Sequence, residues 1–149
     1  MRIIQATLEH LDVLTPMFIR YRELYGAMPL VEESRAFLEQ CLSTQQAVAF
    51  LAFDEATDKL MGFNLLYLSH SSLSLRPVWI LNDIFVCENS RRKQVARHLV
   101  IRAKEEAIKN NAVRIRVATN SANETTHKMY ESLGFYENHQ LTNYILALE

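Results

Sequence analysis

The chain has 149 residues, 49% hydrophobic and 22% charged, and its 16 lysines and arginines nearly balance its 17 aspartates and glutamates, giving a formal net charge of -1. This composition excludes a disordered protein, and the lack of a positive excess argues against nucleic acid as a partner. The length suits one domain, 1–149, that buries roughly two-thirds of the surface of its unfolded chain.

No segment predicts a membrane, metal or disulfide site. The longest apolar run, 47–53, is too short to cross a bilayer, and the first residues lack the apolar centre of a secretion signal. We therefore expect no membrane partner and a cytoplasmic location. Cys41 and Cys87 have no CxxC spacing and no histidine cluster near them, so neither a metal nor a disulfide is predicted.

In the first half of the chain, the spacing of apolar residues predicts a strand, two helices and a hairpin. The first helix opens at Thr7, and Gly26 and Pro29 separate it from the second. A polar turn joins two apolar runs that predict antiparallel strands. The expected ranges are 3–6 for the first strand, 31–42 for the second helix, and 47–53 and 60–68 for the hairpin.

In the second half, strands and helices alternate. A predominantly apolar run predicts a central strand, and the next helix has apolar residues at every fourth position. Ser121 and Glu124 have the spacing of a capping box for a further helix that ends at Gly134. The expected ranges are 78–86 for the central strand, 91–109 for the helix after it, 113–117 for a half-buried strand and 141–148 for a final strand. This order favours a mixed sheet with helices on both faces.

The most informative stretch joins the strand 78–86 to the helix that follows it. Arg91, Arg92 and Lys93 lie directly before the helix. A helix start leaves backbone N–H groups unpaired beside the positive end of the helix dipole, which together form an anion site. The three cations and this site suit a pyrophosphate, although a basic triplet can also be a solvated surface.

Val86 through Ala96 resembles the acetyl-CoA signature of the GNAT (Gcn5-related) N-acetyltransferases, which is Arg/Gln-x-x-Gly-x-Gly/Ala between a strand and a helix. Arg91, Gln94 and Ala96 occupy its three defined positions, with Gln94 in place of the usual glycine. Because only glycine accepts a positive φ without strain, we expect Gln94 to keep an ordinary φ, with its amide directed at phosphate.

The resemblance implies how acetyl-CoA is bound. The backbone of the strand would bind the pantetheine arm, and the loop and first helical turn would bind the pyrophosphate. The residues implied are Ile84, Phe85 and Val86 on the strand, and Arg91, Arg92, Lys93, Gln94, Val95 and Ala96 at the helix start.

A second block, Asn123 to Phe135, resembles the family's Asn-x-x-Ala-x-x-Leu-Tyr-x-x-x-Gly-Phe helix. The resemblance implies that Tyr130 protonates the leaving thiolate of CoA, a role that a positioned phenol can fill. Without the motif, Tyr130 would be a core tyrosine. Asn123 matches a family contact to pantetheine or to the helix that bears the acid, and it can equally be a helix cap.

The resemblance also implies the fold. It is the α/β (α+β) GNAT fold, a mixed, mostly antiparallel sheet of six to seven strands with helices on both faces. In the family the strand that corresponds to 113–118 splays from 78–86 beside a β-bulge, and backbone N–H groups there can stabilise the thioester oxygen. Dimers are common among the proteins that it resembles, so a homodimer is expected.

The acceptor amine must lose a proton, because an alkylammonium has no free lone pair at neutral pH. Some family members have Glu where Asn82 stands, so we nominate Asp83 as the base, with a structural carboxylate as the alternative. Successive strand side chains face opposite ways, so only one of these two residues should face the acceptor. His70, on the loop before this strand, is the second candidate.

The resulting hypothesis is an N-acetyltransferase in which a primary amine attacks acetyl-CoA directly. The acceptor is a small-molecule or protein amine, which Tyr21, Tyr25, His70 and Asn82 are expected to contact. Gln94 and Asn82 depart from the family pattern, and they leave open a noncatalytic acyl-CoA-binding or interaction module on the same fold.

Overall fold

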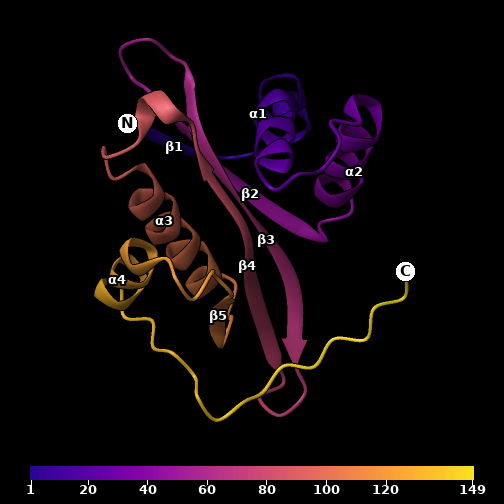
Figure 1. The fold of residues 1–149 in the computed structure, drawn as a ribbon, viewed down its shortest axis with the longest axis vertical. Coiled ribbons are helices and arrows are strands. Elements are labelled where there is room, and N and C mark those ends of the chain that lie inside the picture. Colours follow the sequence, from indigo (N-terminus) through magenta and orange to yellow (C-terminus); the bar gives the residue numbers. More distant parts are fainter. The chain divides into compact units, whose positions relative to one another are not determined.

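The computed structural model describes all residues 1–149, which form two compact units, Met1–Ala118 and Thr119–Glu149. The first unit contains the sheet and three helices, and the second contains one helix, α4 (Figure 1). The strands are β1 (Arg2–Gln5), β2 (Ala47–Phe53), β3 (Leu60–Ser71), β4 (Arg76–Val86) and β5 (Arg114–Val117). The α-helices are α1 (Leu11–Leu24), α2 (Val31–Ser43), α3 (Val95–Lys109) and α4 (Glu124–Ser132), and short 3₁₀ turns span Leu8–His10 and Glu88–Ser90.

The sheet has five strands in the order β1-β2-β3-β4-β5. The first four are antiparallel to their neighbours, whereas β5 runs parallel to β4. The expectation of a mixed, mostly antiparallel sheet is therefore confirmed, and the expectation of six to seven strands is wrong. Because α3 connects β4 to β5, the two strands run in the same direction, as a helical crossover requires.

The final strand that the sequence predicted over 141–148 is not formed. Residues 135–149 contain no helix or strand, and all of 136–149 are exposed. The prediction was wrong because an apolar run reports the tendency of side chains to be buried, whereas a strand also needs a neighbour for its backbone hydrogen bonds.

Helices cover both faces of the sheet, as expected (Figure 1). On one face α1 and α2 pack on β2 and β3, where Leu14, Leu38 and Phe63 are fully buried. On the other face α3 packs on the same strands. There the buried Asn64 donates to the Leu99 carbonyl at 3.0 Å and accepts from the Phe50 N–H at 3.1 Å. Each large apolar side chain buried in this way contributes about 1.5–3 kcal/mol.

Helix α4 of the second unit begins two residues later than the capping pattern suggested. Asn123, not Ser121, is the cap, and its Oδ1 accepts from the Thr126 N–H at 3.1 Å. Gly134 follows the helix with a φ of 94°, a conformation in which glycine is favoured. Across both units, no helix is long and apolar enough to cross a bilayer.

Candidate functional site

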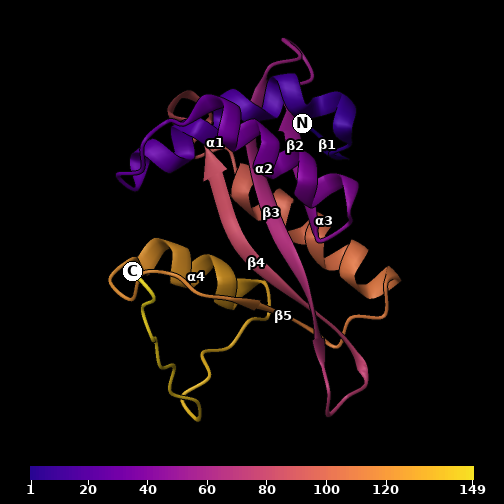
Figure 2. The same ribbon diagram turned by 90° about the vertical axis from the view of Figure 1, so that its right-hand side faces the viewer.

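The two parallel strands of the sheet separate halfway along β4. Pairing with β5 runs from Val78 opposite Arg114 to Leu81 opposite Val117, where β5 ends. Strand β4 continues to Val86, so residues 82–86 have no strand neighbour on this side. In Figure 2 the ribbons of β4 and β5 lie at a wide angle to each other. The result is an open strand edge inside the sheet, which we call the split.

The alternation of hydrogen bonds determines which backbone groups face the split. Cys87 lies opposite Met61 and donates its N–H to the Met61 carbonyl at 2.9 Å. In an antiparallel pair such bonded positions recur at every second residue. Phe85 and Asp83 therefore bond to β3, and the backbone groups of Ile84 and Val86 point into the split. Among these groups, the Val86 carbonyl accepts from Arg91 Nε at 3.3 Å.

Gly62 holds β3 close to this end of β4. It lies opposite Val86, and a Cβ on Gly62 would come within 2.6 Å of the Phe85 carbonyl oxygen. Any side chain here would push the end of β4 away from β3. Sequence reasoning did not single out Gly62, although a glycine within an apolar strand is a signal of close backbone approach.

A β-bulge lies where the split begins. Asp83 is opposite Leu65 and Leu81 is opposite Leu66, so Asn82 is the extra residue on β4. The bulge interrupts the regular alternation of side chains here, and Asn82 is exposed whereas Asp83 is buried. Asn82 Nδ2 donates to Asp83 Oδ1 at 3.0 Å, which brings the two candidate residues into one group.

Asp83 is 7% exposed, and its carboxylate is held from α1. Tyr21 Oη donates to Asp83 Oδ1 at 2.6 Å. Burial first, and then this bond to Asp83, raise the pKa of Tyr21 well above its usual range, so the phenol stays protonated and remains a donor. Oδ2 of Asp83 has no hydrogen-bond partner and is not among the fully enclosed polar atoms. It is therefore the carboxylate oxygen that is open to a further hydrogen bond.

Aromatic rings surround the Tyr21 end of this group. The ring of Tyr21 lies 5.1 Å from Tyr25, 5.8 Å from Phe63 and 6.2 Å from Phe85, each in an edge-to-face arrangement. Tyr25 is 74% exposed, so this cluster extends from the core to the surface. Burial, followed by the charge of Asp83, raises the pKa of Tyr67 to about 12.

His70 is not part of this group. It lies within β3, opposite Pro77, and not in a loop as expected. Pro77 and Asp83 are six positions apart on β4, which corresponds to about 20 Å along a strand. The structure therefore brings Tyr21, Tyr25, Asn82 and Asp83 together and places His70 elsewhere.

The loop after β4 turns into α3 through left-handed backbone. Gln94 has a φ of 61° and Arg92 a φ of 64°. The expectation of an ordinary φ at Gln94 is wrong, because the chain adopts here the conformation that glycine would favour, at a cost of about 1 kcal/mol. The helix itself begins at Val95, not at Arg91. The Gln94 carbonyl accepts from the His98 N–H at 3.1 Å and lies 2.8 Å from His98 Nδ1.

The start of α3 is electrically positive. Arg91, Arg92 and Lys93 are all exposed, and the first turn of α3 contains no acidic residue. The N–H groups of Val95 and Ala96 come before the first intrahelical bond, as at any helix start. This arrangement suits an anionic group.

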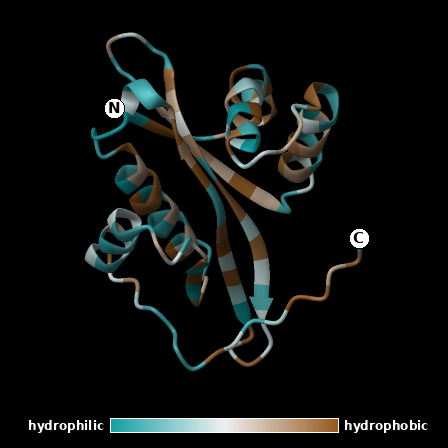
Figure 3. Ribbon diagram, in the orientation of Figure 1, coloured by the Kyte–Doolittle hydropathy of each residue, from teal (hydrophilic) through white to brown (hydrophobic).

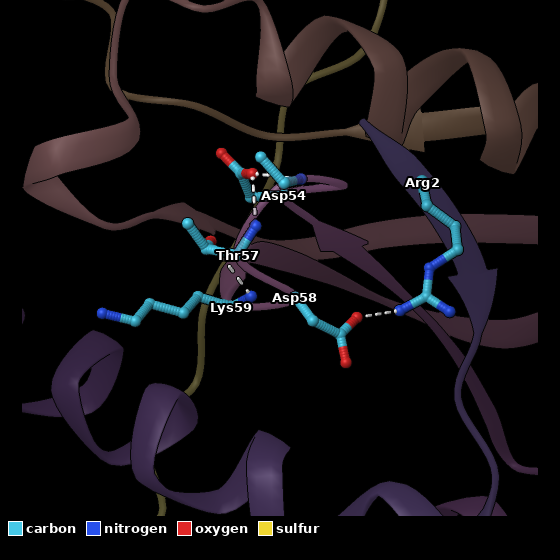
Figure 4. A network of polar contacts seen from close by, with 6 residues as sticks. Arg2, Asp54, Thr57, Asp58 and Lys59 are labelled. Atoms are coloured by element: carbon cyan, nitrogen blue, oxygen red, sulfur yellow. Dashed lines mark hydrogen bonds and ion pairs between the residues drawn. The ribbon is translucent and has the colours of Figure 1, made fainter.

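Figure 4 shows the turn of residues 54–59, whose Asp54 lines the same hollow as Lys93. Asp54 Oδ1 accepts from the N–H groups of Ala56 at 2.8 Å and Thr57 at 3.1 Å, and these bonds, Thr57's first, hold the Asp54 pKa below its usual value. Arg2 and Asp58 form an ion pair at 2.6 Å. A hollow of about 300 Å³ is lined by Met1, Asp54, Glu55, Ala56, Met61 and Lys93. Its two carboxylates disfavour a polyphosphate there.

In the second unit Tyr130 is 5% exposed, and its ring lies 5.2 Å from that of Phe135 in an edge-to-face arrangement. Asn123 acts as the helix cap, one of its two expected roles. Nowhere in the two units do three or more His, Cys, Asp or Glu side chains gather as a metal site, and both cysteines are free.

The chain resembles known proteins along most of its length. Residues 14–135 match the acetyltransferase (GNAT) family. An uncharacterized N-acetyltransferase, YhfO, of Bacillus subtilis is 32% identical over 146 residues, covering 98% of this chain and 97% of that protein. A probable acetyltransferase of Haemophilus influenzae is 33% identical over 135 residues, covering 91% and 90%. The crystal structure of a probable acetyltransferase is 52% identical, with a TM-score of 0.94, and covers 100% of this chain and 99% of that one.

Proposed function

This chain belongs to the GNAT acetyltransferase family, and on that basis we propose that it transfers the acetyl group of acetyl-CoA to a primary amine by direct attack. The observation that carries the proposal is the split. An open strand edge with unpaired backbone groups leads directly to a positive helix start. A ligand with a chain of amides and a pyrophosphate fits both parts.

The residues present fit the pantetheine arm of acetyl-CoA. The backbone of Ile84 and Val86 offers hydrogen bonds to the two amides of pantetheine, as an added strand would. Phe85, between them, bonds to β3 and keeps the edge in place. Acetyl-CoA supplies an acetyl group activated as a thioester.

The pyrophosphate would be bound at the start of α3. The N–H groups of Val95 and Ala96 and the left-handed turn at Gln94 form the anion site, and Arg91, Arg92 and Lys93 add charge. Arg91 bonds to the Val86 carbonyl at the end of the open edge. It therefore joins the proposed pantetheine site on the strand to the proposed pyrophosphate site at the helix start.

The amine is activated in this proposal by Asp83. Its Oδ2 accepts a proton from the acceptor ammonium, while Tyr21 and Asn82 hold Oδ1. The amine nitrogen then bonds to the acetyl carbon and releases its second proton to water, from which the proton donor is later restored; the carbon–sulfur bond breaks, and the sulfur takes a proton. Tyr130 is proposed to donate that proton, and Asn123 to position its helix or contact pantetheine.

The acceptor is proposed to be a cationic amine, on a small molecule or a protein. An ammonium group near Asp83 would find a carboxylate oxygen, and the faces of Tyr21 and Tyr25 nearby can attract a cation. The exposed position of Tyr25 supports an entrance for the acceptor at the end of α1.

Calorimetry with CoA, followed by release of CoA thiol in the presence of a panel of amines, tests the proposal. Replacing Arg91, Arg92 and Lys93 with alanine should weaken CoA binding by about thirtyfold or more, since charged hydrogen bonds contribute about 1.5–3 kcal/mol each. The matched control replaces Lys104, Lys109 and Arg114, which are also exposed, and should leave binding unchanged. Tight binding without thiol release on any amine would identify the noncatalytic module instead, and no binding would reject both functions.

A further inference from the structure

The connection between α1 and α2 is apolar and exposed. Residues 24–31, which we call the apolar loop, contain no charged side chain. Five large apolar side chains of this loop are between 44% and 74% exposed: Leu24, Tyr25, Met28, Leu30 and Val31. In Figure 3 both helices that the loop joins carry brown, hydrophobic residues. A contiguous apolar segment on the surface is typical of a binding site.

Hydrogen bonds from both helices hold the backbone of the apolar loop. Arg22 Nη1 donates to the carbonyl groups of Met28 and Pro29, to the latter at 2.9 Å. It also donates to Ser34 Oγ at 3.2 Å, and this hydroxyl donates to the Pro29 carbonyl at 2.9 Å. The Ser34 N–H donates to the Leu30 carbonyl at 2.8 Å. A ligand that lies on the loop would therefore have little backbone to order, which favours binding.

The apolar loop is continuous with the proposed acceptor site through Tyr25. The ring of Tyr25 lies 5.1 Å from that of Tyr21. The phenol of Tyr21 in turn donates to Asp83 Oδ1 at 2.6 Å. Two aromatic rings therefore connect the loop to the carboxylate, and an ammonium group at Asp83 would have an apolar surface beside it.

The charges around the apolar loop favour an acceptor with a single amine over a polycation. Asp83 is the carboxylate proposed to receive the ammonium, and the loop adds no other. Arg20 on α1 places its guanidinium carbon 5.9 Å from the centre of the Phe85 ring and forms no ion pair, so it would repel a second cation. Glu23 and Glu32, which adjoin the loop, are exposed. Water and salt weaken the attraction of such exposed carboxylates for a polycation.

We propose that the acceptor is a monoamine with an apolar alkyl or aryl body, and that this body lies on the apolar loop while the nitrogen reaches Asp83. The inference rests on the proposed acetyl transfer, because it names the class of acceptor for that reaction. Contact between the body and the loop removes apolar surface of both from water, which supplies the affinity. The contact between the ammonium group and Asp83 positions the nitrogen for attack.

The first test compares 2-phenylethylamine with butane-1,4-diamine, a dication that has no apolar end. Calorimetry in the presence of CoA should show at least about tenfold tighter binding of the aromatic amine, because its ring loses contact with water. Release of CoA thiol from acetyl-CoA should show the same preference in kcat/KM. Tighter binding or faster acetylation of the diamine would overturn the proposal. Tight binding of 2-phenylethylamine without thiol release would support the apolar site and reject the proposed acetyl transfer.

A triple variant, Met28→Gln, Leu30→Asn and Val31→Thr, makes the apolar loop polar while keeping side chains of similar size. Leu30 has a φ of 42°, a left-handed conformation that asparagine tolerates better than leucine, so the fold should be kept. The affinity for 2-phenylethylamine should fall about tenfold or more, and the affinity for CoA should not change. The control, Glu32→Gln with Glu33→Gln, removes charges next to the loop and should leave both affinities unchanged. Full affinity for the amine in the triple variant, or its loss in the control, would overturn the proposal.

Sedimentation of the parent chain and the triple variant tests the competing occupant of the apolar loop, a second copy of the chain. Both should have the same oligomeric state, because in this proposal the loop binds the acceptor. A parent dimer that dissociates in the triple variant would show that the loop is an interface between copies, and would overturn the proposal.

Discussion

Tyr21 and Asp83, 62 residues apart in the sequence, are joined by a hydrogen bond of 2.6 Å from the phenol to the carboxylate. The bond links α1 to the strand residue next to the bulge, where β4 and β5 separate. It fixes one oxygen of Asp83 and leaves the other without a hydrogen bond. Local sequence spacing contains no signal for such a pair, because the fold alone brings the two residues together.

If Asp83 is the base, replacing its carboxylate with the amide of asparagine removes the group that accepts the proton. Asp83→Asn should lower turnover by about a hundredfold or more, and Tyr21→Phe by about tenfold because the carboxylate loses its donor. Neither variant should change the affinity for CoA. The control Asp58→Asn replaces a carboxylate whose side chain is 79% exposed and should keep full turnover. Unchanged turnover in Asp83→Asn would leave Asp83 a structural residue.

The partly buried Tyr67 predicts a loss of stability at alkaline pH. Its pKa is raised to about 12, whereas in the unfolded chain it returns to about 10. Between these values the unfolded chain loses the proton that the folded chain retains, so the free energy of unfolding should fall with rising pH, by up to about 1.4 kcal/mol per pH unit from this residue. Below about pH 10 it should cause no change.

Denaturant titrations at about pH 9, 10 and 11 measure this slope. Tyr67→Phe should make it shallower, leaving the part due to Tyr21, whose pKa is also raised, whereas Tyr136→Phe, at a side chain that is 85% exposed, should not change it. Equal slopes in Tyr67→Phe and the parent chain would contradict the assigned origin of the effect.

Gln94 and Gln45 have the same side chain in the same left-handed conformation, with φ values of 61° and 56°. Replacing either with glycine should raise the free energy of unfolding by up to about 1 kcal/mol, because glycine adopts this conformation without strain. CoA affinity should be kept in both variants, since the proposed phosphate site consists of backbone N–H groups and not of the Gln94 amide. A loss of CoA binding in Gln94→Gly alone would show that the glutamine amide itself contacts the ligand.

Tyr130→Phe should lower turnover by roughly a hundredfold if the phenol is the general acid. The ring and its contact with Phe135 are retained. Tyr136→Phe serves as the control for loss of a phenol nearby in the sequence. Full turnover in Tyr130→Phe would remove this residue from the mechanism.

The sequence predicted the elements of the first unit well, because amphipathic periodicity reports which residues are buried. The prediction of a final strand over 141–148 was wrong, because apolar side chains indicate a tendency to be buried and do not indicate a neighbour for the backbone hydrogen bonds. The sequence-based prediction was also wrong about Gln94, whose backbone conformation is set by the turn that enters α3. The relation between Asn82 and Asp83 depended on a bulge, and a register shift of one residue leaves no local pattern in the sequence.

The split is the central feature of this account, and residue-resolved hydrogen exchange tests it most directly. Without CoA, the amides of Ile84 and Val86 should exchange quickly because no strand accepts from them, whereas those of Asp83 and Phe85, bonded to β3, should be protected. Saturating CoA should protect Ile84 and Val86 and leave the other two unchanged. Fast exchange at Ile84 and Val86 with CoA bound would contradict the account.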